Sequence, residues 1–250
     1  MSIPKVGTFV ITILAKAESK GCPGKHLRKL GKYSLLEHTF FQARVVHGLL
    51  GSGGIIVSTD SVEVADLARQ FKFRVYEQRP RPTATTPKVP AIRNAVLDWL
   101  EDKCVDPHTR PQWVLDLDVT APLRSVEDMA GALNLAYRTN PDCVLSCTQG
   151  VGRNPYFNLL ELDPSGQRLI RSKSADDHIT CRQSAPRVYE ANSSIYVYSR
   201  DFLLNPEVTS PLDGRCVPYV MDDESYYHVD SELDFFIVGA LLRRRHNIDP

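Results

Sequence analysis

The chain has 250 residues, of which 42% are hydrophobic, and its 30 lysines and arginines balance its 30 aspartates and glutamates. This neutral balance argues against a general nucleic-acid-binding protein, which would carry a strongly basic surface. No apolar run reaches the length of a transmembrane helix, and residues 1–10 show no signal-peptide pattern, so we expect a cytoplasmic protein. The length suits a single α/β domain over residues 1–250.

Apolar runs alternate with helical patterns along most of the chain. Strands are expected at Thr8–Ala15, Gly54–Ser58, Arg74–Glu77, Trp113–Leu117, Cys143–Cys147 and Ser194–Tyr198. Helices are expected at Leu35–Val46, Val62–Phe71, Val89–Lys103 and Val126–Thr139. This alternation predicts an α/β fold with a mainly parallel sheet covered on both faces. In such sheets ligands bind at the carboxyl ends of the strands.

Residues 150–191 interrupt this alternation. Tyr156–Leu162 and Arg168–Ile170 flank the turn sequence Asp163-Pro-Ser-Gly166 and predict a hairpin. A polar stretch, Arg171–Gln183, follows it. On the residues alone, a surface hairpin without a partner is one interpretation of this excursion.

The cysteines are scattered and predict no disulfide framework. They are Cys22, Cys104, Cys143, Cys147, Cys181 and Cys216. Cys143 and Cys147 would share one face of a strand but lie too far apart to be bridged. We therefore expect free, mostly buried thiols.

The segment Ile11–Lys25 combines an apolar run with a loop that contains Lys16, Lys20, Lys25 and glycines. A strand, a basic glycine-containing loop and a helix in this order form the usual phosphate site of α/β proteins. The spacing differs from a P-loop and from a dinucleotide fingerprint. A solvated lysine-rich turn is the alternative, but the preceding strand and the glycines favour phosphate binding.

The stretch Lys16–Lys25 resembles the opening signature R-x-x-S-K-G-x-P-x-K-N of the sugar-acid cytidylyltransferases. This family includes the CMP-sialic acid synthetases and relatives that act on legionaminic, pseudaminic, Kdn and Kdo-type acids. Further matches follow in the family's order and cover nearly the whole chain. They are Val57–Asp60, Arg79-Pro80, Thr120–Arg124, Arg182-Gln183, Asn192, Ile195-Tyr196 and Asp230–Phe235.

The resemblance implies a three-layer, Rossmann-like nucleotide-diphospho-sugar transferase fold. It implies transfer of CMP from CTP to a 2-keto-3-deoxy sugar acid of the sialic, Kdn, legionaminic or Kdo type, with release of pyrophosphate. It also implies a divalent cation, Mg²⁺, as cofactor. In the family an excursion such as 150–191 packs against a second subunit and reaches over its sugar site, so a homodimer is expected.

The resemblance assigns one group of residues to the nucleotide: Lys16, Ser19, Lys20, Gly21, Lys25, His26, Arg79 and Thr86. Lys16 stands where arginine is usual, which keeps the charge and loses the bidentate fork. His26 replaces an asparagine, and Arg79 is placed near the cytosine ring. Thr86 replaces an aspartate and Pro90 falls near the serine that reads the base, so this loop alone does not identify the base.

Metal binding is expected at Asp230, which matches the family's metal-binding aspartate, and at Asp118. His228 stands where the family often has a second aspartate; it is a poor magnesium ligand and a hypothetical base. Asp118 occupies a position where glutamine is common, and Asp116 shares its face. Asp118 serves either the metal or the substrate in this interpretation, with capping of the next turn as the alternative. Asp234 is expected to be a charge at a helix N-terminus.

A last group is assigned to the sugar acid: Asp118, Thr120, Arg124, Arg182, Gln183, Tyr189 and Asn192. Arg182 is the preferred partner of the substrate carboxylate, because a guanidinium pairs with a carboxylate through two hydrogen bonds. Arg124 has a structural alternative, in which it fixes the turn before the next helix. Ser193 stands where a glycine is usual.

The resulting hypothesis is in-line attack of an acceptor hydroxyl on the α-phosphorus of CTP. The catalytic group would be Lys16, Lys20, Lys25, Asp230 and His228, which act by positioning and charge neutralisation. The alternatives are a cytidylyltransferase of the same fold acting on a phosphonate or another acid, and a non-catalytic nucleotide-binding protein. A glycosyltransferase is a third, since Asp116-Leu-Asp118 matches an Asp-x-Asp motif; the basic loop favours nucleotidyl transfer.

Overall fold

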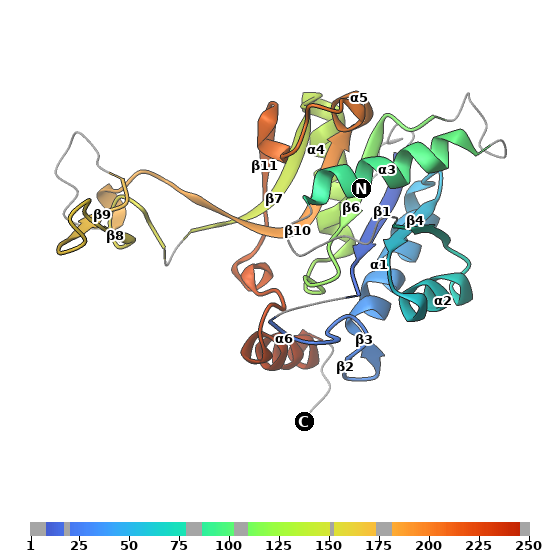
Figure 1. The fold of residues 1–250 in the computed structure, drawn as a ribbon, viewed down its shortest axis with the longest axis horizontal. Helices are drawn as coiled ribbons and strands as arrows, with labels where there is room; N and C mark the ends of the chain where they lie inside the picture. The colour runs from blue at the N-terminus through green and yellow to red at the C-terminus, as the bar shows by residue number, and fades with distance from the viewer. Residues whose placement is uncertain are drawn as a thin grey trace.

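The structure, a computed structural model, describes residues 9–17, 21–78, 87–102, 110–150, 153–173 and 182–245. Its centre is a seven-stranded sheet with the strand order β11-β7-β10-β6-β1-β4-β5 (Figure 1). β10 runs antiparallel to β6 and β7, and the other paired strands of this sheet are parallel. The strands are β1 (Phe9–Ala15), β4 (Ile55–Thr59), β5 (Arg74–Glu77), β6 (Trp113–Leu117), β7 (Cys143–Gln149), β10 (Tyr189–Ser199) and β11 (Cys216–Val220).

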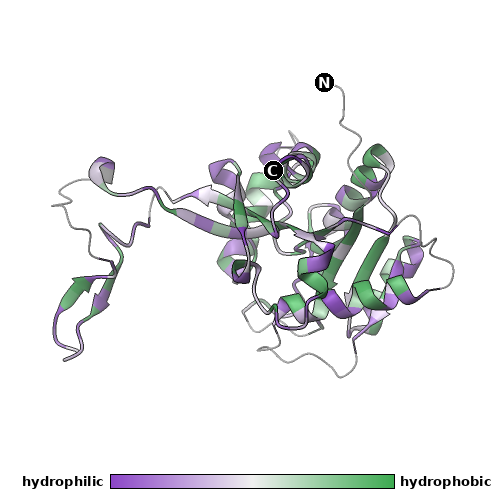
Figure 2. Ribbon diagram, turned by 90° about the horizontal axis from the view of Figure 1, so that it is seen from above, coloured by the Kyte–Doolittle hydropathy of each residue, from purple (hydrophilic) through white to green (hydrophobic). Residues whose placement is uncertain are grey.

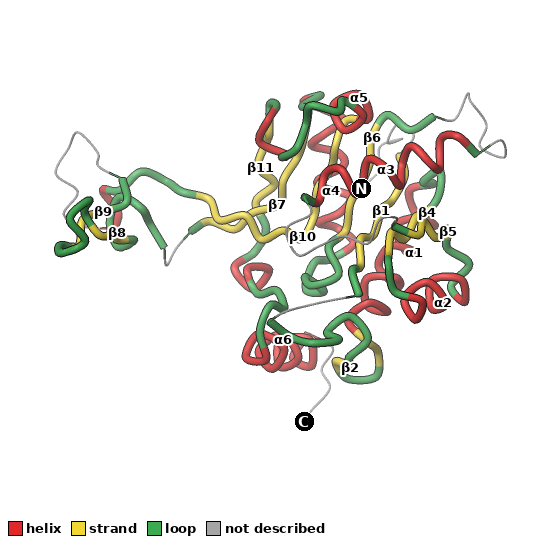
Figure 3. Tube along the Cα trace, viewed as in Figure 1, coloured by secondary structure: helices red, strands yellow, loops and turns green. Residues whose placement is uncertain are grey.

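Helices cover both faces of the sheet, as the alternation of elements predicts (Figure 3). They are α1 (Leu35–Leu50), α2 (Val62–Gln70), α3 (Lys88–Glu101), α4 (Val126–Thr139), α5 (Arg200–Leu204) and α6 (Glu232–Arg245). Phe9, Ile11 and Ile13 of β1 join a core with α1, α2 and α4, whereas Val10 joins a core with α3 and α5. Side chains alternate along a strand, so one strand supplies both cores.

Short elements complete the fold. β2 (Lys29–Leu30) and β3 (Tyr33–Ser34) form a small hairpin before α1, and 3-10 turns occupy Arg182–Ser184, Pro211–Asp213 and Asp223–Tyr226. No helix in the described ranges is long and apolar enough to cross a membrane. The free cysteines of the described part are Cys22, Cys143, Cys147 and Cys216, the first three of them buried, as expected.

The ends of α1 and α4 are fixed by local sequence. Ser34 with Glu37 and Ser125 with Asp128 form capping boxes, in which each side chain bonds to the other residue's main-chain N–H. α1 ends at Gly51, whose φ of 71° lies in the left-handed region that favours glycine. These local signals fix where both helices begin and where α1 ends.

The excursion forms the expected hairpin, from β8 (Leu160–Leu162) and β9 (Leu169–Arg171). It stands apart from the sheet at the end of the ribbon made by β7 and β10 (Figure 1). Leu162 pairs with Leu169, and these side chains are 60% and 62% exposed. Figure 2 shows hydrophobic colour on these two strands although they lie outside the cores.

Asn192 fixes the start of this ribbon. β10 is irregular between Ala191 and Tyr196, and Ser193 within the bulge has a φ of 53°. The fully buried Asn192 accepts hydrogen bonds at Oδ1 from Ser146 Oγ (2.6 Å) and Ser194 N (3.2 Å). The side chain expected to contact the sugar acid thus stabilises the bulge, and the left-handed conformation explains why glycine would suit position 193.

Arg124 is also bonded to the protein itself. It is 2% exposed, and its Nη1 donates to the carbonyls of Asp118 (2.6 Å) and Ala121 (3.0 Å) while Nη2 donates to Thr39 Oγ1 (3.1 Å). Burial lowers the pKa of Arg124 to about 10, with the nearby carboxylates opposing that shift, so the group stays charged at neutral pH. The structure therefore favours the structural alternative for Arg124 over contact with the substrate carboxylate.

Replacing Arg124 by methionine is expected to lower the free energy of unfolding by about 3 kcal/mol, because buried carbonyls lose charged donors. Urea denaturation of the variant and the wild type measures the difference, and Arg124→Lys should lose less. Unchanged stability combined with a raised KM for the acceptor would instead show that Arg124 contacts substrate.

Candidate functional site

A pocket of about 250 Å³ opens at the carboxyl ends of the central strands, where ligands of such sheets bind. It is lined by the end of β1, the loop that follows it, the first turn of α3 and the loop after β6. The lining residues are Leu14, Lys16, Lys25, His26, Lys88, Asp118 and Thr120. Five of these residues were expected from the sequence; Leu14 and Lys88 were not.

The loop after β1 is anchored to the neighbouring strand. The main-chain N–H of Ala17 donates to Asp60 Oδ1 at 2.7 Å, just beyond the end of β4. Burial lowers the pKa of Lys16, and the charge of Asp60 opposes this. Burial also lowers the pKa of His26, whose ring is hydrogen-bonded to the main chain of Lys16, so His26 is neutral at neutral pH. Lys16 therefore brings positive charge into the pocket, while His26 brings a neutral polar ring.

Lys25 connects this loop to the C-terminal part of the chain. Its Nζ donates to the carbonyl of Val229 at 2.6 Å and to Asp230 Oδ1 at 3.0 Å, and the residue is 8% exposed. Val229 N in turn donates to the carbonyl of Thr120 at 2.8 Å. The basic loop, the Thr120 loop and Asp230 are thus brought together.

Gly21 is required by this arrangement. A Cβ atom built on Gly21 would overlap the main-chain carbonyl oxygen of Asp230. A larger residue would force apart the basic loop and the segment that carries Asp230. The close approach gives a physical reason for glycine at this position.

Asp230, which contacts Lys25, also contacts His228. His228 Nε2 lies 3.0 Å from Asp230 Oδ2, and His228 Nδ1 lies 3.1 Å from the carbonyl of Tyr226. The Asp230 side chain is 65% exposed, so its carboxylate remains accessible from solvent. The described ranges hold no group of three or more histidine, cysteine or carboxylate side chains arranged as a ready metal site.

Asp118 is bound to the protein's own groups. Its Oδ1 accepts hydrogen bonds from Thr120 N (2.9 Å) and Thr120 Oγ1 (2.7 Å), and its Oδ2 lies 3.0 Å from Lys88 Nζ. The structure therefore gives Asp118 the capping role that the sequence left as its alternative, together with an ion pair. Lys88 was missed because its partners lie about thirty residues away in sequence, and no local pattern indicates them.

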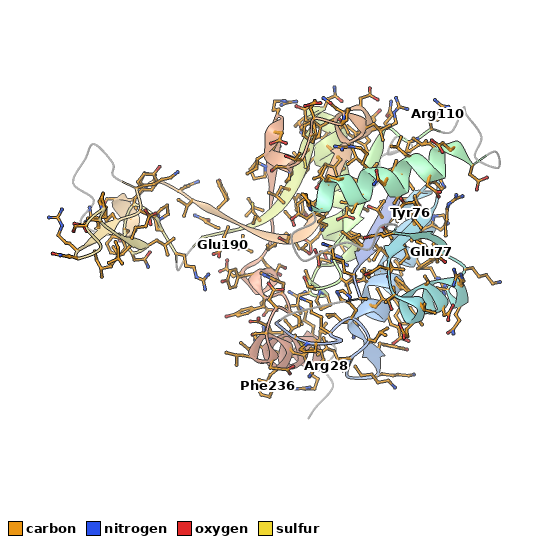
Figure 4. All side chains as sticks on the ribbon, in the orientation of Figure 1. Arg28, Tyr76, Glu77, Arg110, Glu190 and Phe236 are labelled. Carbon is orange, nitrogen blue, oxygen red and sulfur yellow. The ribbon has the colours of Figure 1, made fainter. Side chains whose placement is uncertain are left out.

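The residues that follow the basic loop contact α6 through Arg28. Arg28 makes a bidentate pair with Glu232, at 2.5 Å and 2.9 Å, and its guanidinium lies 4.1 Å from the centre of the Phe235 ring. Figure 4 shows Arg28 at the α6 end of the molecule. Burial raises the pKa of Cys22, which keeps it a thiol beside this pair. Asp234 accepts from Ser231 N at 2.8 Å and caps α6, as expected.

The projecting ribbon of β7 and β10 with the β8–β9 hairpin at its end is called the arm (Figure 1), and a second cavity, of about 260 Å³, lies at its base. Arg153 and Glu190 form an ion pair at 3.5 Å there, and Figure 4 shows Glu190 where the ribbon leaves the body. The main-chain carbonyl of Tyr226, one of the residues that line this cavity, lies 3.1 Å from His228 Nδ1. The cavity is lined by Thr148, Gln149, Arg153, Glu190, Asp223, Tyr226 and Tyr227.

The remaining expected residues divide into two groups. Ser19, Lys20, Arg79 and Thr86 lie outside the described residues, as does the side chain of Arg182. Gln183 is exposed in its 3-10 turn, and Tyr189 is 50% exposed at the start of β10. Their roles toward the sugar acid stay predictions.

Comparison with known proteins identifies the family. A family model described as cytidylyltransferase matches residues 10–90. A CMP-N,N'-diacetyllegionaminic acid synthase of Campylobacter jejuni is 36% identical over 97% of both chains. The chain belongs to the sugar-acid cytidylyltransferase family. Post-translational flagellin modification protein B of Campylobacter coli is 35% identical over 95% of this chain and 96% of that protein.

Solved structures share the cytidylyltransferase fold at low sequence identity. A CMP:2-keto-3-deoxy-manno-octonic acid synthetase in complex with CTP has a TM-score of 0.67 and 17% identity, over 96% of this chain and 100% of that one. A 4-diphosphocytidyl-2C-methyl-D-erythritol synthase of Anaerococcus prevotii has a TM-score of 0.62 and 16% identity, over 95% and 100%. The expected fold class is confirmed.

Gly21→Ala is expected to lower the rate of cytidylyl transfer by about 100-fold. The added Cβ would push the main chain of Asp230 away from the basic loop, and a small displacement of a catalytic group is enough for such a loss. Steady-state kinetics and urea denaturation measured together separate this effect from unfolding. Gly48→Ala is the matched control, since a Cβ there meets no atom within 4 Å. Equal rates for Gly21→Ala and Gly48→Ala would contradict the role of the close approach.

Proposed function

We propose that this protein couples CTP to a 2-keto-3-deoxy sugar acid of the N,N'-diacetyllegionaminic type, forming the CMP-sugar and pyrophosphate. The observation that carries the proposal is the contact of the basic loop with Asp230 through Lys25, at the carboxyl edge of the sheet. The choice of acid is supported by the similarity over nearly the full length to a relative with that activity in its name.

The reaction in this proposal is a direct displacement. The acceptor's anomeric hydroxyl oxygen forms a bond to the α-phosphorus, and the bond from that phosphorus to the bridging oxygen of pyrophosphate breaks. Lys16 and Lys25 neutralise the phosphates, which carry most of the charge that must be stabilised. The two ring nitrogens of His228 face the carbonyl of Tyr226 (3.1 Å) and Asp230 Oδ2 (3.0 Å), so His228 is proposed to position Asp230 rather than to act as the base, and the hydroxyl proton leaves to solvent.

Mg²⁺ is proposed to be held by Asp230. This carboxylate is mostly exposed and fits a cation that prefers carboxylate and water ligands. When bound, the ion would neutralise charge on the nucleotide phosphates. Both carboxylates pair with a lysine, Asp230 with Lys25 and Asp118 with Lys88, but the Asp118 side chain is only 23% exposed against 65% for Asp230, so Asp118 does not fit as a second ligand.

The acceptor is proposed to occupy the cavity at the base of the arm. Arg153, which also pairs with Glu190 at 3.5 Å, provides a guanidinium for the substrate carboxylate, and the carbonyl of Tyr226 contacts His228, the neighbour of Asp230. Its tyrosines offer apolar faces and hydroxyl groups, which suits a sugar with acylamino and hydroxyl substituents.

A homodimer is proposed as the working form. Leu160, Leu162 and Leu169 lie on one face of the β8–β9 hairpin and are 50–62% exposed. An apolar face at the end of a projecting arm is stabilised when a second surface covers it. The arm of one protomer would then close the acceptor cavity of its partner, in agreement with the excursion's expected role.

Pyrophosphate release with Mg²⁺ tests the reaction and its acceptor. N,N'-diacetyllegionaminic acid with CTP is expected to give turnover, whereas sialic acid, Kdn, Kdo and phosphonate acceptors, or the other three nucleoside triphosphates, give little. Asp230→Asn should lose about 100-fold or more in rate at equal stability, as for removal of a major electrostatic group. Turnover with a phosphonate alone, or nucleotide binding without turnover on any acid, would contradict the proposal.

The double variant Leu162→Lys/Leu169→Lys is expected to convert dimer to monomer, because it places like charges on directly paired residues of the apolar face. Sedimentation velocity measures the change. Glu161→Lys is the control, since Glu161 lies on the opposite face of the hairpin and pairs with Ile170. A wild type that sediments as a monomer, or a double variant that remains dimeric, would show that this face is not the interface.

A further inference from the structure

Asp116 and Asp118 have the spacing of an Asp-x-Asp metal motif, but a lysine lies between them. Both residues point to the α3 face of the sheet, because they are two apart at the end of β6. Lys88 Nζ lies 2.8 Å from Asp116 Oδ2 and 3.0 Å from Asp118 Oδ2. The ammonium group thus occupies the position that a shared cation would take.

The position is closed by further groups. The face of the Tyr196 ring lies 4.4 Å from Lys88 Nζ, and an aromatic face favours a cation. Asp116 is fully buried, and its other oxygen, Oδ1, accepts from Thr12 Oγ1 at 2.8 Å. Thr12 and Tyr196 are the register partners of Asp116 on the two neighbouring strands. The sheet itself therefore sets the arrangement.

Each carboxylate oxygen of the pair has a partner from the protein. Thr12 bonds to Asp116 Oδ1, Thr120 bonds to Asp118 Oδ1, and Lys88 contacts Oδ2 of both residues. A divalent ion would have to displace the ammonium or bring two positive charges against it. Asp230 also pairs with an ammonium, that of Lys25 at 3.0 Å, but it differs in access: its side chain is 65% exposed, whereas those of Asp116 and Asp118 are 0% and 23% exposed.

The protonation of the cluster agrees with this geometry. Burial alone would lower the pKa of Lys88, but the charges of Asp116 and Asp118 outweigh it and raise that pKa well above its usual value. Burial alone would raise the pKa of Asp118, but Lys88 and the Thr120 hydrogen bonds hold it well below its usual range. The ammonium and the carboxylate therefore both stay charged around neutral pH.

We propose that Lys88 is a built-in cation that closes a latent metal site between Asp116 and Asp118, so that the divalent ion of the reaction binds at Asp230 alone. The part concerning Asp230 rests on the proposed function; the part concerning Lys88 does not. Lys88 lines the nucleotide pocket and holds Asp118 and the Thr120 loop at its wall. It is thus a positioning residue for the pocket.

Mn²⁺ alone is the probe, and the fraction bound is read from the electron paramagnetic resonance of free Mn²⁺. All variants carry Asp230→Asn, which removes the site of the proposed reaction, so the readout does not depend on turnover. With Lys88 present we expect no saturable binding. Adding Lys88→Ala is expected to create one Mn²⁺ site per chain with a Kd of about 1 mM or tighter, typical of a weak carboxylate site.

The control is the triple variant Asp230→Asn/Lys88→Ala/Asp118→Asn, in which the new site should weaken by about ten-fold or more. Binding to Asp230→Asn that is lost on adding Asp118→Asn would show that Asp118 already binds metal, and would overturn the proposal. Equal binding with and without Lys88→Ala would also overturn it.

Lys88→Ala leaves a buried carboxylate without its cation, and the variant can fail to fold. Two Mn²⁺ measurements with Lys88 intact then decide. In the presence of CTP, Asp118→Asn should change the Mn²⁺ affinity by less than about three-fold, whereas Asp230→Asn should weaken it by about ten-fold or more. If Asp118→Asn weakened Mn²⁺ binding as much as Asp230→Asn does, the proposal would be overturned. This measurement needs no acceptor, so its outcome does not depend on the proposed function.

Discussion

The site depends on the contact of the Lys25 ammonium group with the segment that carries Val229 and Asp230. This contact joins the loop after the first strand to Val229 and Asp230, 204 and 205 residues later in the chain. A charge that is nearly buried is costly unless it is paired. Lys25 is therefore stable in its position only when the C-terminal segment lies against the loop. Gly21 permits that approach, and the bond from Val229 to Thr120 extends it to the loop after β6.

The pocket contains lysines with different electrostatic roles, and their partners determine which role each has. Burial lowers the pKa of Lys16, whereas the two aspartates raise the pKa of Lys88. The charge of Lys88 is neutralised by Asp116 and Asp118, and its side chain forms part of the pocket wall. Lys25 is paired with Asp230, the accessible carboxylate, and we propose that Lys25 and Lys16 contact the phosphates.

Elements with local signals could be predicted from the sequence, and those set by tertiary contacts could not. β5, β6 and α4 have the expected bounds, because their period and their caps are encoded locally. A helix N-terminus was expected at Asp234, but the range of α6 was not predicted, since its apolar residues are not confined to one face: Leu233 and Phe236 are 67% and 68% exposed. β11 was also missed, because Pro218 argues against a strand and is tolerated here only at the edge of the sheet.

The same distinction applies to the site. The motifs named Lys16, Lys25, His26, Asp118 and Thr120 as site residues, and in the structure these five line one pocket. The roles of Arg124 and Asn192 were less predictable, because an arginine or an asparagine in a motif gives no indication of whether it faces a ligand or a main-chain carbonyl. The Lys88 pairing depends on the register of three strands and the start of a helix, and no single segment encodes it.

A crystal structure of the protein with CTP and Mn²⁺ tests this account most directly, because the anomalous signal of manganese locates each bound ion. The account predicts the triphosphate between Lys16 and Lys25, one anomalous peak at coordination distance from Asp230, and Lys88 still between Asp116 and Asp118. Phosphates elsewhere on the sheet, or a manganese peak bonded to Asp118 with Lys88 displaced, would contradict it.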